Sequence, residues 1–245
     1  MSSEFGSCSC PESSVAPADE YLIDLIVDQV KLALSARSEP GSREMEIRNG
    51  VPLVPLGVSN RHIHLTKETF QRLFGDKAEF ESMRPLYQPG EFASKHTLAI
   101  AGPKLRTIPS VRILGPLRKY DQVEVSLTDA IYLGIDPPVA NSGTLDKASP
   151  LTLIGPNGSV YLERCAIVAS RHIHMPGADA RKLGVRDGDL CRVRVGGDKP
   201  TVFENVLVRT NDSWRLQIHL DTDDANAANI REDTSVEFLG TMEKR

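Results

Sequence analysis

Alternating apolar and polar residues predict that most of this chain folds as short β-strands. Such alternation occurs at residues 123–127 and 191–195, and turns rich in Gly, Pro, Asn and Asp bound runs of this kind. The Asn157-Gly158 pair lies between two apolar runs and is typical of a β-hairpin turn. Helical patterns are few and short, at residues 67–74 and 178–183. The pattern therefore predicts a mainly β fold class, either β-barrels or a β-sandwich, with short helical caps.

The first forty or so residues follow a different pattern. Residues 1–17 are rich in Ser, Pro and Glu and are expected to be disordered. Residues 19–37 have one broad apolar face and a polar stripe that includes Asp24 and Asp28, which predicts an amphipathic helix, and residues 38–42 predict a flexible linker. This helix either docks on a partner protein, packs on the rest of the chain or lies on a membrane surface. Its acidic stripe disfavours an anionic lipid surface.

The tetrapeptide Arg-His-Ile-His occurs at residues 61–64 and again at residues 171–174. A serine and a short apolar run precede each copy and a short helical pattern follows it, so the repeat indicates two related subdomains that arose by duplication. On a strand, residues two apart point to the same face, so each copy directs two imidazoles at one point and its isoleucine into the core. Two imidazoles in that arrangement suit a zinc ion. The alternative is that they hydrogen-bond to the backbone of a nearby turn.

Several other polar residues are open to more than one interpretation. Asp221 follows His219 by two residues and either belongs to a polar turn or orients a ligand imidazole. One of the aspartates at residues 223–224 is expected to cap the next helix. Glu124 either faces solvent or points into a site, and His96 is expected to be a surface residue of a strand.

Two turns carry groups that could hold an anion. Residues 114–118 contain a Gly-Pro turn that ends in Arg118, with Lys119 next to it. Residues 141–144, Asn-Ser-Gly-Thr, are small and offer hydroxyls and backbone N–H groups, which suit phosphate. Each segment is also consistent with an ordinary turn.

Composition and charge exclude several classes of protein. The 29 Lys+Arg against 33 Asp+Glu give a formal net charge of −4, and aromatic residues make up only 5%, which argues against a nucleic-acid-binding protein. No apolar run approaches the roughly 20 residues of a membrane-spanning helix, and the first twenty residues do not have the pattern of a secretory signal. The four cysteines are expected to be reduced thiols. These features predict an intracellular, cytoplasmic protein with no membrane or nucleic-acid partner.

Taken together, these motifs resemble those of the PduL-type phosphate acyltransferases, which are phosphotransacylases of bacterial microcompartments. The resemblance lies in residues 59–65, 112–118, 122–124, 170–175 and 219–227, and it runs in consistent order from about residue 51 to residue 239. It implies two β-barrels with short helical caps and a two-metal centre, normally zinc, between them. The implied metal ligands are the imidazoles and one carboxylate of His62, His64, Glu124, His172, His174 and His219.

The resemblance also implies roles for two residues outside the ligand set. Arg118 would be the essential catalytic arginine that binds phosphate, and Ser142 would be a second phosphate contact. His96 has no role in the family pattern. The division of the six ligands between the two metals stays open at this point.

A domain arrangement and a location follow from the same resemblance. Residues 51–60 together with 170–240 would form the first barrel, and residues 61–169 would form the second, inserted barrel. Residues 1–44 would be an N-terminal extension whose helix docks on shell or cargo proteins in the lumen of a bacterial microcompartment. The protein is expected to form a homo-oligomer, a dimer or higher.

The implied reaction converts a short-chain acyl-CoA and phosphate into an acyl phosphate and CoA, with two zinc ions per chain. Two alternatives use the same ligands. One is a dinuclear metallohydrolase in which a bridging water takes the place of phosphate. The other is a non-catalytic, metal-stabilised barrel that serves as a cargo adaptor.

Overall fold

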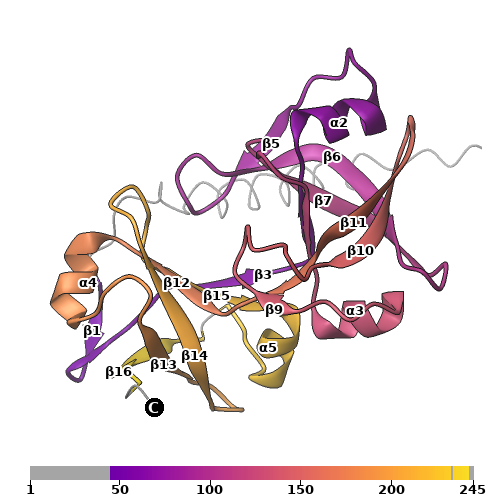
Figure 1. Ribbon diagram of the computed structural model, residues 1–245. Coiled ribbons are helices and arrows are strands. Elements are labelled where there is room, and N and C mark those ends of the chain that lie inside the picture. The colour runs from indigo at the N-terminus through magenta and orange to yellow at the C-terminus, as the bar shows by residue number, and fades with distance from the viewer. Residues whose placement is uncertain (1–44, 233, 243–245) are drawn as a thin grey trace, which may run out of the picture. The chain divides into compact units, whose positions relative to one another are not determined.

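The computed structural model describes residues 45–232 and 234–242, and strands are the main regular element of this part of the chain (Figure 1). The predicted amphipathic helix at residues 19–37 and the linker that follows it lie outside the described residues. No helix in the described ranges is long and apolar enough to cross a membrane. The predicted mainly β fold class with short helices is confirmed.

Six strands close into a barrel. Their hydrogen-bonded order is β10, β11, β8, β4, β7, β6, and β6 also pairs with β10, which completes the ring. A short strand, β5, extends this sheet beside β6, and β9 pairs with β11. The strands are β4 (His62–His64), β5 (Ser82–Pro85), β6 (Phe92–Ala101), β7 (Thr107–Gly115), β8 (Gln122–Glu124), β9 (Val139–Ala140), β10 (Ser149–Gly155) and β11 (Gly158–Ala169).

Six further strands form a second sheet, a half-barrel with the order β16, β13, β14, β12, β15, β3. The chain just before β3 runs back along β16, where Leu53 bridges to Glu237. The strands are β3 (Leu56–Ser59), β12 (His172–Met175), β13 (Leu190–Val195), β14 (Thr201–Thr210), β15 (Gln217–Asp221) and β16 (Val236–Thr241). A separate small hairpin consists of β1 (Ile47–Arg48) and β2 (Val51–Pro52).

Local sequence signals account for most of the helices. The helix α2 (Lys67–Phe74) begins at Thr66, whose side chain accepts a hydrogen bond from the Thr69 amide, and α4 (Gly177–Leu183) ends at Gly184 in the left-handed region with φ 68°. Both confirm the predicted short helices. The helix α5 (Thr222–Ala227) is capped by Asp221, so the expectation of a cap at residues 223–224 was wrong.

Only the first two residues of the predicted alternation at residues 123–127 lie in a strand. Strand β8 ends at Glu124, and Ser126 then caps the helix α3 (Leu127–Leu133) in a capping box with Asp129. A serine cap followed by an acidic residue three positions later therefore overrides the continuing apolar period. The predicted β10–β11 hairpin is confirmed, but its two turn residues are Pro156 and Asn157, one position before the predicted Asn157-Gly158 pair, and Gly158 already belongs to β11.

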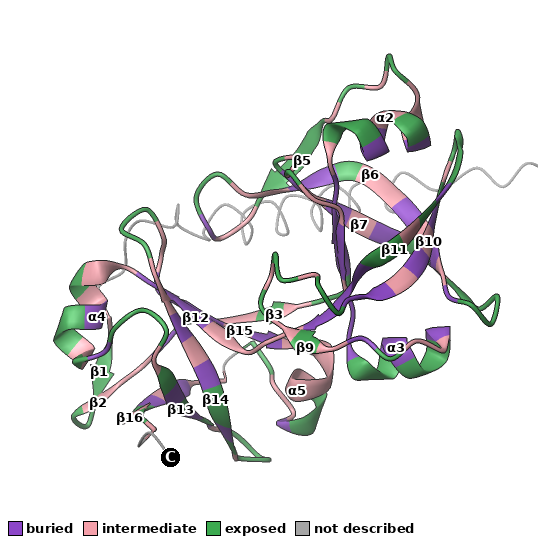
Figure 2. Ribbon diagram, in the orientation of Figure 1, coloured by how far each residue is buried: buried purple, intermediate pink, exposed green. Residues whose placement is uncertain are grey.

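Each sheet encloses its own hydrophobic core (Figure 2). The central isoleucine of each Arg-His-Ile-His copy, Ile63 in one core and Ile173 in the other, is 0% exposed. The predicted inward orientation of these isoleucines is confirmed, and it leaves the flanking histidines on the opposite face of their strands.

Candidate active site

The structure gathers the six predicted ligands into two triads. One consists of His62, His64 and Glu124, and the other of His172, His174 and His219. Within each triad, one potential ligand atom of every residue lies within 4.8 Å of the others. Each His-Ile-His pair therefore contributes to a separate triad, and the third residue comes from a neighbouring strand.

The two triads have the same strand framework. His62 on β4 lies opposite Glu124 on the antiparallel β8, and His172 on β12 lies opposite His219 on the antiparallel β15. The arginine before each histidine pair makes an equivalent ion pair with the helix that follows the partner strand. Arg61 bonds to Asp129 on α3 at 2.8 Å, and Arg171 bonds to Asp224 on α5 at 2.7 Å. The predicted repeat thus extends to the partner strand and its helix, as expected for a duplication.

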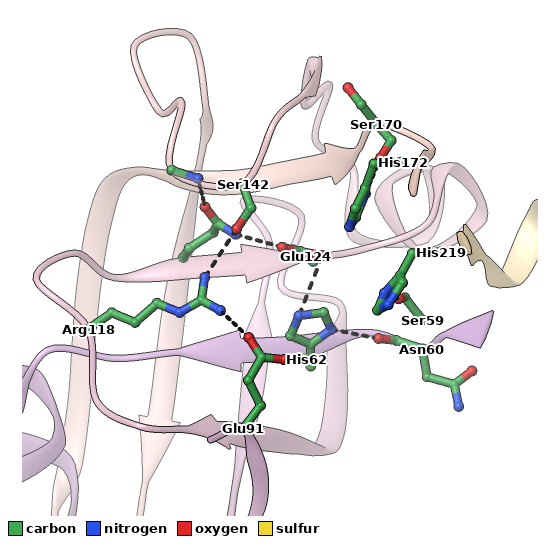
Figure 3. Close-up of polar contacts among 12 residues, drawn as sticks. Ser59, Asn60, His62, Glu91, Arg118, Glu124, Ser142, Ser170, His172 and His219 are labelled. Atoms are coloured by element: carbon green, nitrogen blue, oxygen red, sulfur yellow. Dashed lines mark hydrogen bonds and ion pairs between the residues drawn. The ribbon is translucent and has the colours of Figure 1, made fainter. Parts of the chain in front are cut away.

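Backbone carbonyls orient the first histidine of each pair. The Nδ1 of His62 lies 2.8 Å from the Asn60 carbonyl oxygen, and the Nδ1 of His172 lies 2.8 Å from the Ser170 carbonyl oxygen (Figure 3). A carbonyl only accepts, so each Nδ1 carries the proton and each Nε2 is left with a free lone pair. These are the conditions under which an imidazole binds a metal through Nε2.

The distances between potential ligand atoms within each triad suit a tetrahedral metal ion. The Nε2 atoms of His172 and His174 lie 3.0 Å apart, and Nε2 of His62 lies 3.4 Å from Oε2 of Glu124. Two nitrogens bound to one zinc at 2.0–2.1 Å are about 3.3 Å apart. The buried Nδ1 atoms of His64 and His174 have no hydrogen-bond partner among the described residues.

Burial keeps most of these histidines neutral. It is the main cause of a lowered pKa at His64, at His172, at His174 (to about 3) and at His219 (to about 2). Neutral imidazole is the form that binds metal. Five imidazoles and one carboxylate, with unpaired buried nitrogens, are a donor set that fits zinc or a similar transition-metal dication.

The predicted phosphate contacts lie next to the first triad. The guanidinium of Arg118 donates to the Ser142 hydroxyl at 3.2 Å and lies 3.5 Å from a carboxylate oxygen of Glu91 (Figure 3). It also donates to the Tyr120 hydroxyl at 3.0 Å. Gln122 bonds to both Ser142 and Glu124. A continuous hydrogen-bonded chain therefore connects the arginine to a potential metal ligand.

Residues of each triad also affect the pKa values of histidines in the other. The charge of His62 contributes to the lowered pKa of His219, and Glu124 acts on the pKa of His172 in the opposite direction. Ser59, at the end of β3, reaches Nδ1 of His219 at 3.3 Å, three residues before His62 begins the first triad. The two triads are therefore electrostatic neighbours.

Sequence reasoning missed three polar residues of this site: Gln122, Glu91 and Arg209. The charge of Arg209 helps to lower the pKa of all three histidines in the second triad, and burial raises the pKa of Glu91. One signal was present, because Gln122 precedes Glu124 by two residues just as Gln217 precedes His219. Glu91 and Arg209 stand in segments with no repeat or motif, so no comparable signal marks them.

Two other residues that the sequence singled out, Asp221 and His96, lie outside the triads. The carboxylate of Asp221 accepts from the Asp224 amide at 2.8 Å as the cap of α5, which favours the polar-turn alternative for this residue. His96 lies on β6 as expected, but it is not a free surface residue, because its ring packs against Phe70 and Phe74 and its Nδ1 is buried. It lies in neither triad.

Comparison with known proteins agrees with this arrangement. The sequence profile of the phosphate propanoyltransferase family matches residues 55–231. The chain belongs to the phosphate propanoyltransferase family. It is therefore an acyltransferase, and the family resemblance noted in the sequence is confirmed. All six triad residues, Arg118 and Ser142 fall inside the matched region.

Individual relatives show the same similarity. The phosphate propanoyltransferase of Lachnoclostridium phytofermentans is 48% identical over 177 residues, which are 72% of this chain and 83% of the relative. That of Thermotoga maritima is 47% identical over 178 residues, 72% of this chain and 84% of the relative. That of Rhodopseudomonas palustris is 45% identical over 183 residues, 75% of this chain and 80% of the relative.

Proposed function

We propose that this enzyme transfers a short acyl group between coenzyme A and phosphate at a centre of two zinc ions. The observation that carries the proposal is the hydrogen-bonded chain from Arg118 through Ser142 and Gln122 to Glu124, which joins an anion-binding arginine to a metal-binding triad. The ligands of one ion would be His62, His64 and Glu124, and those of the other would be His172, His174 and His219.

Arg118 supplies what the nucleophile requires. Phosphate is a doubly charged and strongly hydrated ion at neutral pH, so it must be stripped of water and oriented before it attacks a thioester. A guanidinium presents a planar set of donors that matches two phosphate oxygens at once. Arg118 is only partly exposed and is held by Tyr120 and Ser142, so its donors are ordered before phosphate arrives.

The metal ions and the side chains have separate tasks. When bound, a zinc pair would supply Lewis acidity toward the thioester carbonyl and a partner for the CoA thiolate. The two triads would hold the ions through neutral imidazoles and the Glu124 carboxylate, and Arg118 and Ser142 would hold the phosphate. The reaction balances as acyl-CoA plus HPO₄²⁻ giving acyl phosphate dianion plus CoA thiol, so the proton of the phosphate ends on the CoA sulfur.

No side-chain nucleophile is needed for this chemistry. Cys165 and Cys191 are buried, and burial raises the pKa of each thiol to about 12, so neither is a thiolate at neutral pH. Phosphate itself is the nucleophile that the arrangement around Arg118 favours.

The test is release of CoA from acetyl-, propionyl- and lactoyl-CoA by the purified full-length enzyme, with and without phosphate, together with metal analysis. We expect CoA release only when phosphate is present and about two zinc ions per chain. Equal consumption of acyl-CoA without phosphate would identify a hydrolase instead, and normal metal content without any turnover would favour the adaptor.

We also propose a location and an organisation for the chain. The amphipathic pattern at residues 19–37 and the linker after it support a role for residues 1–44 as an extension that directs the enzyme to the lumen of a bacterial microcompartment. Residues 51–60 with 170–240, and residues 61–169, would be its two β-domains. We expect these domains to assemble into a homo-oligomer.

A further inference from the structure

Gln122 is the most completely buried polar side chain of the candidate site, at 0% exposed. Its carboxamide nitrogen donates to Oε1 of Glu124 at 2.7 Å and to the Ser142 hydroxyl at 2.8 Å, and its oxygen accepts from the Gly143 amide at 2.7 Å. The Gly143 N–H can only donate, so it fixes which end of the carboxamide faces Glu124 and Ser142. A flipped carboxamide would place its NH₂ group against that N–H.

One consequence concerns Glu124. Gln122 donates to Oε1 and thereby leaves Oε2 as the oxygen with both lone pairs available to a metal, and Oε2 lies 3.4 Å from Nε2 of His62. Without the amide donor, the two oxygens of Glu124 would be equivalent and the carboxylate would be free to rotate. Gln122 therefore selects the oxygen that Glu124 presents beside the histidine.

A second consequence concerns Ser142. Its hydroxyl oxygen accepts from Gln122 and from Arg118, and neither of these groups can accept a hydrogen bond in return. Both lone pairs of the oxygen are then in use, so the hydroxyl hydrogen must point to a third group. A phosphate bound by the adjacent Arg118 would offer an acceptor oxygen for that hydrogen.

The equivalent residue of the other repeat makes a comparable contact. Gln217 lies opposite His174 as Gln122 lies opposite His64, and its Oε1 is 2.9 Å from Nε2 of His219. There the carboxamide accepts where Gln122 donates, because its neighbour is an imidazole instead of a carboxylate. Gln217 accepts a hydrogen bond from Gln88 at 3.2 Å, and within the described part of the chain it makes no hydrogen bond to Ser142 or Arg118.

We propose that Gln122 is a positioning residue that sets both the metal-facing oxygen of Glu124 and the phosphate-facing hydroxyl of Ser142, so that one side chain adjusts two binding steps. The inference rests on the proposed function, since it assumes that Glu124 binds metal and that Ser142 binds phosphate. It predicts that loss of a single carboxamide damages zinc binding and phosphate binding together, although Gln122 contacts neither.

The test replaces Gln122 in the full-length enzyme by Met, which has nearly the same length and lacks all three hydrogen bonds. We expect Gln122→Met to raise the KM for phosphate and to weaken one of the two zinc sites, each by roughly tenfold to hundredfold. The KM for acyl-CoA should change much less. Zinc affinity is measured by competition with a chromophoric chelator, independently of turnover.

Two comparison variants separate the two effects. Ser142→Ala should raise the phosphate KM and leave both zinc affinities unchanged, while Gln217→Met should weaken one zinc site with little change in phosphate KM. In the double variant Gln122→Met/Ser142→Ala, the rise in phosphate KM should be smaller than the product of the single effects, because both changes break the same contact.

The outcomes distinguish this inference from the function on which it rests. If wild-type enzyme shows phosphate-dependent CoA release and Gln122→Met loses only thermal stability, Gln122 is structural and the inference is wrong. If the wild type shows no such release, the proposed function fails, and calorimetry of phosphate binding to the zinc-loaded protein then replaces the KM in deciding the inference. If the Met variant does not fold, Gln122→Glu keeps the side-chain size and the acceptor for Gly143, and the same pair of losses is expected.

Discussion

Replacement of Arg118 by Lys tests the proposed phosphate site most directly, because it keeps the positive charge and removes the planar donor geometry. In the structure, the Arg118 guanidinium donates to Tyr120 and Ser142 and lies near Glu91, while its remaining N–H groups are available to a ligand. A lysine ammonium is a point charge that cannot bond to two phosphate oxygens in parallel. The expected loss is therefore about one charge-assisted hydrogen bond.

The free energy of that hydrogen bond can be converted into a fold-change in kcat/KM. A hydrogen bond to a charged group contributes about 1.5–3 kcal/mol, and about 1.4 kcal/mol corresponds to a factor of ten. We therefore expect the kcat/KM for phosphate of Arg118→Lys to fall by roughly 10–150-fold. Arg118 touches neither triad directly, and its backbone bond to the Leu65 carbonyl is retained, so zinc content and thermal midpoint should remain close to wild type.

The assay is the initial rate of CoA thiol release at fixed acyl-CoA and varied phosphate, with zinc content measured on the same sample. Lys119→Gln is a matched control, because it removes the adjacent exposed charge without changing the Arg118 guanidinium. Its phosphate kinetics should be those of the wild type. Wild-type phosphate kinetics in Arg118→Lys would remove Arg118 from the site and refute the reasoning.

Four further predictions test other parts of the account. His174→Ala should lose about one zinc per chain and nearly all activity, as measured by metal analysis and CoA release; full zinc loading would contradict the second triad. Burial raises the pKa of Glu91, so this group stabilises the fold at low pH and that contribution is lost as the pH rises through the raised pKa. In the metal-free protein, Glu91→Gln should therefore gain unfolding free energy over wild type at pH 7 and show no gain near pH 4, as measured in urea. Cys165 and Cys191, with their pKa values raised to about 12, should resist iodoacetamide at pH 8 until the protein is denatured, which mass spectrometry can follow. Deletion of residues 1–42 should leave acyl transfer intact, while those residues fused to a fluorescent protein should be recruited to shells; loss of folding on truncation would contradict the targeting role.

Features set by neighbouring residues could be predicted from the sequence. The helix after Thr66 was predicted because its cap and its apolar period are both local. The β10–β11 hairpin was predicted because Asn157-Gly158 between two apolar runs indicates a turn, and the observed turn lies one residue earlier. The grouping of imidazoles within each His-Ile-His pair followed from the two-residue period of a strand. The assignment of third ligands rested on family resemblance, because no local pattern shows that β8 pairs with β4 or that β15 pairs with β12.

Features set by distant contacts could not be predicted in this way. Gln88 bonds to Gln217, which is 129 residues away, and neither residue has a local sequence that indicates the other. Arg209 acts on the histidines from β14, a strand that pairs with β12 in parallel and so depends on a long connection. The closed barrel and the half-barrel have the same kind of strand pattern, and they differ in whether the first and last strands meet.

The repeat explains how a symmetric framework can produce an asymmetric site. The two triads differ at one position, where Glu124 in one corresponds to His219 in the other, and the lowered pKa of His219 keeps that residue neutral. A dication held by the first triad would have one of its charges neutralised by the carboxylate, while a dication held by the second would retain both. Gln122 donates to the carboxylate and Gln217 lies beside the imidazole, so the same residue type serves both because a carboxamide has both a donor and an acceptor. In the proposed acyl transfer, phosphate enters as an anion and the CoA sulfur leaves as a thiolate that then takes the phosphate proton, so two neighbouring centres of unequal charge suit it better than two identical ones.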